Sequence, residues 1–377
     1  MAQQSIRELA RTGRTPIEVM DAATWAVFQE GWREPFGSDA DHLKTFDDVD
    51  RMAAAGFTMF TVDPGEHVDN SADSAPLDEV RARLERLPWD ELRSSPEDCR
   101  KRYAGRKVAL EGGAKLDISE EAALRAAAKY GGAVAHTVRM ARRVEAAVGR
   151  RPFELEMSVD ETDTPTSPEA HYYVASELKR LGVNPVSLAP RFIGRFEKGV
   201  DYIGDPAEFE RSFALHAAIA RTLGPYKISL HSGSDKFGVY GIAARHAGGL
   251  VHVKTAGTSY LEALRTVAEM APELFRDILD FARSRYDKDK ASYHVSADVR
   301  KVPAAKALPD GRLASVLDSF DGRQVLHVTF GSVLTEREGE GYRFRDRILD
   351  VLKANEERHY EAIAKHLARH AAPFCRV

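Results

Sequence analysis

Two short apolar segments, each delivering a histidine, set the strongest limit on how this chain can fold. They are residues 227–231 (KISLH) and residues 250–254 (LVHVK). Because strand side chains alternate between two faces, one face of each segment is apolar, and the other carries an imidazole and, in the second segment, an amine. The residues between the segments suffice for a short helix, which is typical of a parallel strand–helix–strand unit. Barrels built from such units place catalytic groups at the carboxyl ends of their strands.

The rest of the chain continues this alternation of strands and helices. The pattern predicts strands near residues 57, 153, 186, 227, 250, 293 and 325. It predicts a helix over residues 3–12, a loop over residues 31–44 and a capping box that opens a helix at Ser259. The alternation indicates an α/β fold, a TIM-like (β/α)8 barrel lacking its first strand, with a doubly wound open sheet as the alternative. A polar helical insertion is expected near residues 71–150, and its first part, residues 71–115, reads as an insertion or lid.

The composition disfavours several classes of protein. The net charge is −4, and acidic and basic residues are interspersed, so binding to nucleic acid is not expected. No apolar run approaches the roughly 18 residues of a membrane span, and the first residues lack the apolar core of a signal peptide. The two cysteines, Cys99 and Cys375, form no CxxC motif. We therefore expect residues 1–377 to form a single cytoplasmic domain that binds neither nucleic acid nor membranes.

Three histidines are candidate ligands for a divalent metal. His231 and His252 lie on adjacent predicted strands, where both could hold one ion while the second ring nitrogen of each meets an orienting partner. His42, in the sequence DADH, is the candidate third ligand. The alternatives are buried, hydrogen-bonded histidines for the strand pair and an ordinary solvated turn for His42.

A carboxylate on the polar face of a predicted strand is the best candidate for acid–base chemistry. Glu156 lies on that face in the segment 153–160, and inside a barrel it would need a metal, a cation or a proton. Its alternative role is a structural salt bridge with Lys254 or Arg191. Asp63, at the end of the strand near residue 57, has the same two possibilities.

Two loops of short side chains follow the histidine strands. Residues 232–236 (SGSDK) and 255–259 (TAGTS) can present hydroxyl and backbone N–H groups, and the second loop leads into a helix N-terminus, which favours anions. Together with their lysines, these loops suit a polyol that carries a carboxylate or a phosphate, and tight strand-to-helix turns are the alternative. The expected substrate-binding residues are Asp63, Arg191, Ser232, Ser234, Asp235, Lys236, Lys254 and Thr255.

Four long segments resemble those of one enzyme family. They are WAVFQEGWREPFGSDADHLKT (25–45), FTMFTVDPGEHVDN (57–70), LHSGSDKFGVY (230–240) and HVKTAGTSYLEALR (252–265). They are similar to the tagaturonate epimerase family of bacterial sugar-acid epimerases, and the resemblance covers nearly the whole chain. It implies interconversion of the ketouronates D-tagaturonate and D-fructuronate on a barrel-like scaffold with a divalent metal, for which Zn, Mn, Co and Ni are all compatible.

The resemblance also implies roles for individual residues. His42, His231 and His252 are expected to hold the metal, and Asp41 and Glu156 are expected to act as the base and the acid. One departure concerns the N-terminus, because members of the family have a Gly-rich strand and loop before the segment that matches AQQSIREL. We therefore expect this chain to be shortened at its N-terminus relative to the family.

The two ketouronates restrict the chemistry. They differ at a hydroxylated carbon two bonds from the ketone, so enolisation beside the ketone cannot invert that carbon. A retro-aldol cleavage followed by re-addition to the other face can, and Asp41 and Glu156, on different segments, suit the two proton transfers. Two rival hypotheses stay open: a metal-dependent sugar isomerase or aldolase on the same scaffold, and an inactive protein that only binds sugar acids.

Overall fold

A single parallel sheet lies at the centre of the fold. The computed structural model describes residues 2–255 and 257–375. Within them the sheet consists of β1 (Ala2–Ser5), β2 (Ser38–Leu43), β3 (Met59–Val62), β6 (Glu154–Ser158), β7 (Ser187–Ala189), β8 (Lys227–Leu230) and β9 (Val251–Val253). The strands are adjacent in the order in which they occur along the chain, all pairs being parallel. This order lacks the reversal that defines a doubly wound sheet, so that alternative is wrong.

The sheet is curled into an open half-barrel. Lys254, directly after β9, places its Nζ 2.7 Å from Oδ1 of Asp41 on β2. These strands are five steps apart in the sheet, which is about 24 Å in a flat sheet. The contact therefore requires the sheet to bend round until side chains from distant strands meet on its concave face. A TIM-like arrangement is thus supported in outline.

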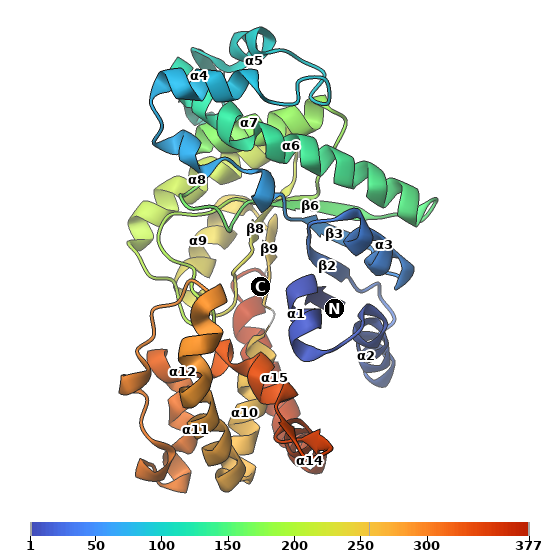
Figure 1. Cartoon of the computed structure of the whole chain (residues 1–377), viewed down its shortest axis with the longest axis vertical. Coiled ribbons are helices and arrows are strands. Elements are labelled where there is room, and N and C mark those ends of the chain that lie inside the picture. Colours follow the sequence, from blue (N-terminus) through green and yellow to red (C-terminus); the bar gives the residue numbers. More distant parts are fainter. Residues whose placement is uncertain (1, 256, 376–377) are drawn as a thin grey trace.

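Helices surround this half-barrel and extend it at one end (Figure 1). Those that cover the sheet are α1 (Ile6–Thr12), α2 (Pro16–Gln29), α3 (Phe46–Ala54), α6 (Glu120–Val148), α7 (Pro168–Arg180), α8 (Pro206–Leu223) and α9 (Phe237–Ala247). A second group with its own hydrophobic core consists of α10 (Thr258–Met270), α11 (Pro272–Asp289), α12 (Phe320–Val328), α13 (Phe330–Thr335), α14 (Arg345–Ala354) and α15 (Glu356–Ala371), with the small hairpin β10 (Arg337–Glu338) and β11 (Gly341–Tyr342). Among the described residues, no helix has the length and apolarity needed to cross a membrane.

Two of the predicted strands are wrong, and two observed strands were predicted as something else. Residues 293–298 have no regular structure, and residues 324–328 belong to α12. The apolar run in α12 is buried on several sides, and a short run of this kind does not distinguish a buried helix from a strand. In their place, β1 occupies residues expected to be helix, and β2 occupies residues expected to be a loop.

Capping sequences mark the start of some helices but not of others. Thr15 and Glu18 form a capping box at the start of α2. The predicted box at Ser259 is wrong, because α10 begins at Thr258, follows Gly257 and has no capping side chain. Two adjacent glycines, Gly131 and Gly132, do not interrupt α6, which runs unbroken from Glu120 to Val148.

The glycine pair in α6 instead allows close packing. A Cβ atom at Gly131 would lie 2.5 Å from a methyl carbon of Leu87, and one at Gly132 would lie 2.9 Å from the carbonyl oxygen of His67. Both neighbours belong to the segment between β3 and α6. The glycines therefore let that segment approach the helix.

The polar segment 71–115 packs on the outer helices. It contains α4 (Leu77–Glu85), α5 (Pro96–Tyr103) and the first strand of the hairpin formed by β4 (Arg106–Ala109) and β5 (Lys115–Ile118). Both helices contact α6. The buried carboxylate of Glu177 on α7 joins the segment to the fold, because it accepts a 2.6 Å hydrogen bond from the Tyr103 hydroxyl and also pairs with Arg180.

We expect Tyr103→Phe to lower the free energy of unfolding by about 1.5–3 kcal/mol, because a buried carboxylate loses a hydrogen-bond donor. Urea denaturation followed by circular dichroism measures the change. The matched control is Tyr342→Phe, whose hydroxyl accepts an exposed hydrogen bond from Arg337, and its effect should stay within about 0.5 kcal/mol. Equal effects of the two substitutions would contradict this account of the Glu177 contact.

Candidate active site

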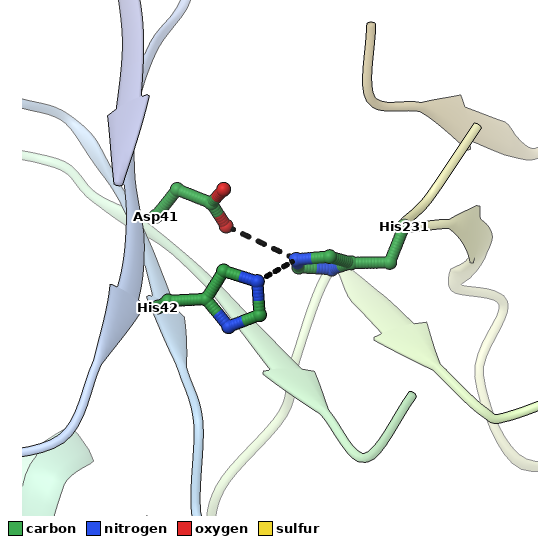
Figure 2. Close-up of side chains that lie close together, drawn as sticks. All are labelled: Asp41, His42 and His231. Atoms are coloured by element: carbon green, nitrogen blue, oxygen red, sulfur yellow. Dashed lines mark hydrogen bonds and ion pairs between the residues drawn. The ribbon is translucent and has the colours of Figure 1, made fainter. Parts of the chain in front are cut away.

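An irregularity in β2 brings two consecutive side chains to the same place. Regular strand alternation would send Asp41 and His42 to opposite faces. The pairing of β2 with β3 shifts register between Ala40 and Leu43, and His42 has φ +54°. This left-handed backbone turns the imidazole toward the concave face, so both side chains point at His231 from across the sheet (Figure 2).

The three residues form a compact group of potential ligands. Nε2 of His231 lies 2.9 Å from Nε2 of His42 and 3.2 Å from Oδ1 of Asp41. Ligand atoms at right angles around an ion with bonds of about 2.1 Å are about 3.0 Å apart. The spacing and the two-nitrogen, one-oxygen donor set therefore fit a divalent transition metal.

The charges around Asp41, His42 and His231 also favour binding of a cation. Burial would lower the pKa of His231, but Asp160 and Asp41 raise it to about 10. Burial would raise the pKa of Asp41, but Lys254 and the two histidines hold it well below its usual range. The carboxylates thus create a strongly negative potential at the buried imidazole.

Lys254 is the centre of the buried polar layer. Its ammonium lies 2.7 Å from Asp41, 3.0 Å from Asp39 and 3.0 Å from Glu156. Despite burial, these carboxylates raise the pKa of Lys254 well above its usual value. Burial raises the pKa of Asp39, whereas Lys254 holds that of Glu156 low. Of the three acids, Asp39 is therefore the one that most readily keeps a proton.

Glu156 connects this layer to both strand histidines. Its Oε2 is 2.8 Å from Nδ1 of His252, and its Oε1 is 3.3 Å from Nδ1 of His231. The alternative predicted for Glu156, a salt bridge with Lys254, is present alongside these contacts. His252 does not join the group formed by Asp41, His42 and His231, and its imidazole contacts the Glu156 carboxylate instead.

Asp63 affects the ligand group indirectly, through its contact with His42. Its Oδ2 lies 3.2 Å from Nδ1 of His42 and its Oδ1 accepts a hydrogen bond from the backbone N–H of Gly65. Burial would raise the pKa of Asp63, but the bond to His42 and the Gly65 amide lower it to about 2. A carboxylate on Nδ1 orients the ring and leaves Nε2 available as a ligand.

The loop after β8 turns its side chains in two directions. Ser232 and Ser234 line a cleft that reaches His231. Lys236 lines the same cleft, but its Nζ donates to the carbonyl oxygens of three residues, and burial lowers its pKa to about 7. Asp235 points away from the cleft toward Arg323, at 2.9 Å. Thr255 follows Lys254, and its carbonyl accepts a hydrogen bond from a hydroxyl in α10.

The cleft is lined by cations that were not predicted. Arg7 and Arg11 of α1 and Lys198 of the loop after β7 surround its mouth, and the predicted Arg191 lines its continuation. Arg7 pairs with Glu161 at 2.9 Å. The cations on α1 were missed because β1 and the direction in which α1 faces are set by the curled sheet and leave no mark in the local sequence.

Comparison with known proteins identifies the family. The sequence matches the tagaturonate epimerase family, UxaE, over residues 1–373. A tagaturonate/fructuronate epimerase from Thermotoga maritima is 46% identical over 370 residues, which are 98% of this chain and 74% of that protein. Native and glycerol-complexed crystal structures of the fructuronate-tagaturonate epimerase UxaE from Cohnella laeviribosi share 40% identity and a TM-score of 0.93, over 99% of this chain and 75% of theirs. The chain belongs to the tagaturonate epimerase family.

Proposed function

We propose that this chain interconverts D-tagaturonate and D-fructuronate by retro-aldol cleavage and re-addition, with a divalent metal at Asp41, His42 and His231. The epimerase activity is that of the family and of its relatives with 46% and 40% identity. The observation that carries the proposal is that Asp41, the carboxylate of this ligand group, lines a cationic cleft and shares the Lys254 ammonium with a second carboxylate of low pKa, Glu156. We also propose that the half-barrel is the TIM-like barrel expected from the sequence, with the opening between β1 and β9 as the place of a further strand, and that it works in the cytoplasm.

His42 and His231 would hold the metal through their Nε2 atoms, with Asp41 as the oxygen ligand. Asp63 and Glu156 face the Nδ1 atoms of these two rings and would keep them in the required tautomer. When bound there, a divalent ion would supply positive charge beside the ketone and hydroxyl oxygens of the substrate. His252, predicted as a third ligand, is better suited to hold Glu156 through their 2.8 Å contact.

Proton transfer at the substrate hydroxyl needs a base that is ionised before the reaction. Asp41 and Glu156 both have pKa values below the usual range, and both form ion pairs with Lys254. Each is therefore an ionised carboxylate next to an ammonium group. They come from different strands, β2 and β6. We assign Asp41, through the oxygen that is not a ligand, to accept the proton of the hydroxyl that becomes the aldehyde. After re-addition, Glu156 delivers to the new alkoxide a proton taken from the Lys254 ammonium, and Asp41 passes its own proton to Lys254, so that all three groups return to their starting states.

The cationic cleft would recognise the substrate carboxylate. Lys198 has no hydrogen-bond or ion-pair partner for its ammonium in the described part of the chain, and it lines both halves of the cleft. Ser232 and Ser234 line the same cleft. A uronate carboxylate at Lys198 would place the sugar chain between these loops and the ligand group.

The first prediction concerns turnover and its need for metal. We expect proton NMR to show conversion of D-tagaturonate into D-fructuronate with Zn²⁺ or another diamagnetic divalent ion, and loss of conversion with EDTA. Recovery after the ion is restored controls for damage by the chelator. Conversion that is undiminished after exhaustive chelation would contradict the metal proposal, while conversion of neutral or phosphorylated sugars instead would favour the isomerase or aldolase hypothesis.

The second prediction tests the two carboxylates. Asp41→Asn and Glu156→Gln should each lower kcat by about 100-fold or more, because a proton transfer loses its acceptor. Glu154→Gln, on the exposed face of the same strand β6, is the matched control and should leave kcat unchanged. Thermal unfolding of every variant separates loss of chemistry from loss of fold, and full activity of either folded site variant would remove that residue from the mechanism.

The third prediction tests recognition of the carboxylate. Lys198→Met should raise KM about tenfold, equivalent to about 1.4 kcal/mol of lost binding, with a smaller effect on kcat. The control is Lys107→Met on the exposed hairpin strand β4. A fall in kcat at constant KM would show that Lys198 serves the reaction itself rather than binding.

A further inference from the structure

A second cluster of potential ligands lies on the far side of the loop that follows β8. It consists of Asp235, His366 and His370, all buried, whose ligand atoms lie within 4.8 Å of one another. We propose that these three residues form a second divalent-metal site, separate from the epimerase site. The proposal does not depend on the reaction assigned to the first site.

The two histidines have a spacing suited to a shared ion. His366 and His370 are four residues apart on α15, so their side chains lie on the same face of the helix. Asp235 faces them from the loop after β8, where its backbone has φ +60°. This left-handed conformation is strained for a residue other than glycine and turns the carboxylate away from the catalytic cleft toward α15.

Contacts on the opposite ring nitrogens leave both Nε2 atoms facing the centre of the cluster. Nδ1 of His370 donates to the backbone carbonyl of His366 at 2.9 Å. Nδ1 of His366 faces a carboxylate oxygen of Glu262 at 3.5 Å. Carbonyl and carboxylate partners of this kind commonly orient histidines that bind metal through the other nitrogen.

Two atoms at the centre lack hydrogen bonds. Among the described residues, Oδ1 of Asp235 and Nε2 of His366 are buried without a hydrogen-bond partner, although they are only 3.7 Å apart. Oδ1 is also 3.8 Å from Nε2 of His370. Ligands of a tetrahedral zinc ion are about 3.4 Å apart, so both distances from Oδ1 are within a few tenths of an ångström of that spacing.

One existing contact would have to give way. The backbone N–H of Asp235 donates to Nε2 of His370 at 3.0 Å. A ring nitrogen has a single lone pair, so this hydrogen bond and a metal bond are alternatives. The other carboxylate oxygen of Asp235 keeps its 2.9 Å contact with Arg323 in either case.

The surroundings define the ion and its route. Two imidazoles and one carboxylate favour Zn²⁺, Co²⁺ or Ni²⁺ over Mg²⁺ or Ca²⁺, which prefer oxygen ligands. Asp235 and His366 line a cavity between α10, α12 and α15, so an ion can reach them from solvent. Because Asp235 follows His231 by four residues, an ion here would tie α15 to the loop that presents the catalytic histidine.

Cobalt titration tests the site in a protein from which the first site has been removed. In His231→Asn, we expect one Co²⁺ per chain, with the visible absorption of a cobalt ion in a site of low coordination number. Adding His366→Asn should weaken this binding by roughly 100-fold or more, because a direct ligand is lost. The matched control, His359→Asn on the same helix, should leave binding unchanged.

Two further measurements distinguish loss of metal binding from misfolding of a variant. Circular dichroism shows whether each variant is folded, and Asp235→Asn replaces His366→Asn if the latter unfolds. Independently of any variant, crystals of the unmodified chain soaked in Zn²⁺ should give an anomalous peak between Asp235, His366 and His370. No peak there, no cobalt bound in His231→Asn, or equal affinities of the His366 and His359 variants would overturn the proposal and leave the epimerase assignment untouched.

Discussion

The buried ammonium of Lys254 is the interaction on which the rest of the structure depends. Three carboxylates, Asp39, Asp41 and Glu156, lie within 3.0 Å of it, although the side chains are withdrawn from water. Isolated charges are costly to bury, and removing one partner of such a group leaves the others uncompensated. Because the acids stand on β2 and β6 and the lysine follows β9, this charge pairing is satisfied only when the sheet curls. The polar layer that holds the half-barrel curved is thus the layer that contains the two carboxylates proposed as the acid–base pair.

This dependence explains which strands could be predicted from the sequence. β3, β8 and β9 contain β-branched or aromatic residues, and β6 alternates Leu155 and Met157 with polar residues, so the local sequence predicts all four strands. β2 has the sequence SDADHL, in which aspartates disfavour a strand, and its main compensating charge is 213 residues away along the chain. No local pattern carries that information. The strand predicted for the apolar run in α12 is wrong for the converse reason, because burial by neighbouring helices overrode the strand propensity of the run.

The positions of site residues could be predicted where the backbone is a regular strand. They could not be predicted where the backbone departs from strand geometry. Alternation placed Glu156 and His231 on the concave face, the DADH sequence indicated His42, and the family resemblance added Asp41; the structure brings the four together. Asp41 and His42 lie on the same face because β2 shifts register and His42 has φ +54°. The sequence does not predict either feature. The same applies to Asp235, whose positive φ sends it to the opposite side of its loop from Ser234.

Lys236 shows how one buried cation can organise both walls of the cleft. Its Nζ donates to the carbonyl oxygens of Glu197, Val200 and Ser234, at 2.7–2.8 Å. It therefore ties the loop that carries Lys198 to the loop that carries Ser232 and Ser234. An ammonium with three oxygen acceptors has little left to offer a substrate, so its contribution to binding is to fix the distance between the two loops. The proposed recognition of the sugar acid thus depends on the buried Lys236, just as the proposed acid–base pair, Asp41 and Glu156, depends on the buried Lys254.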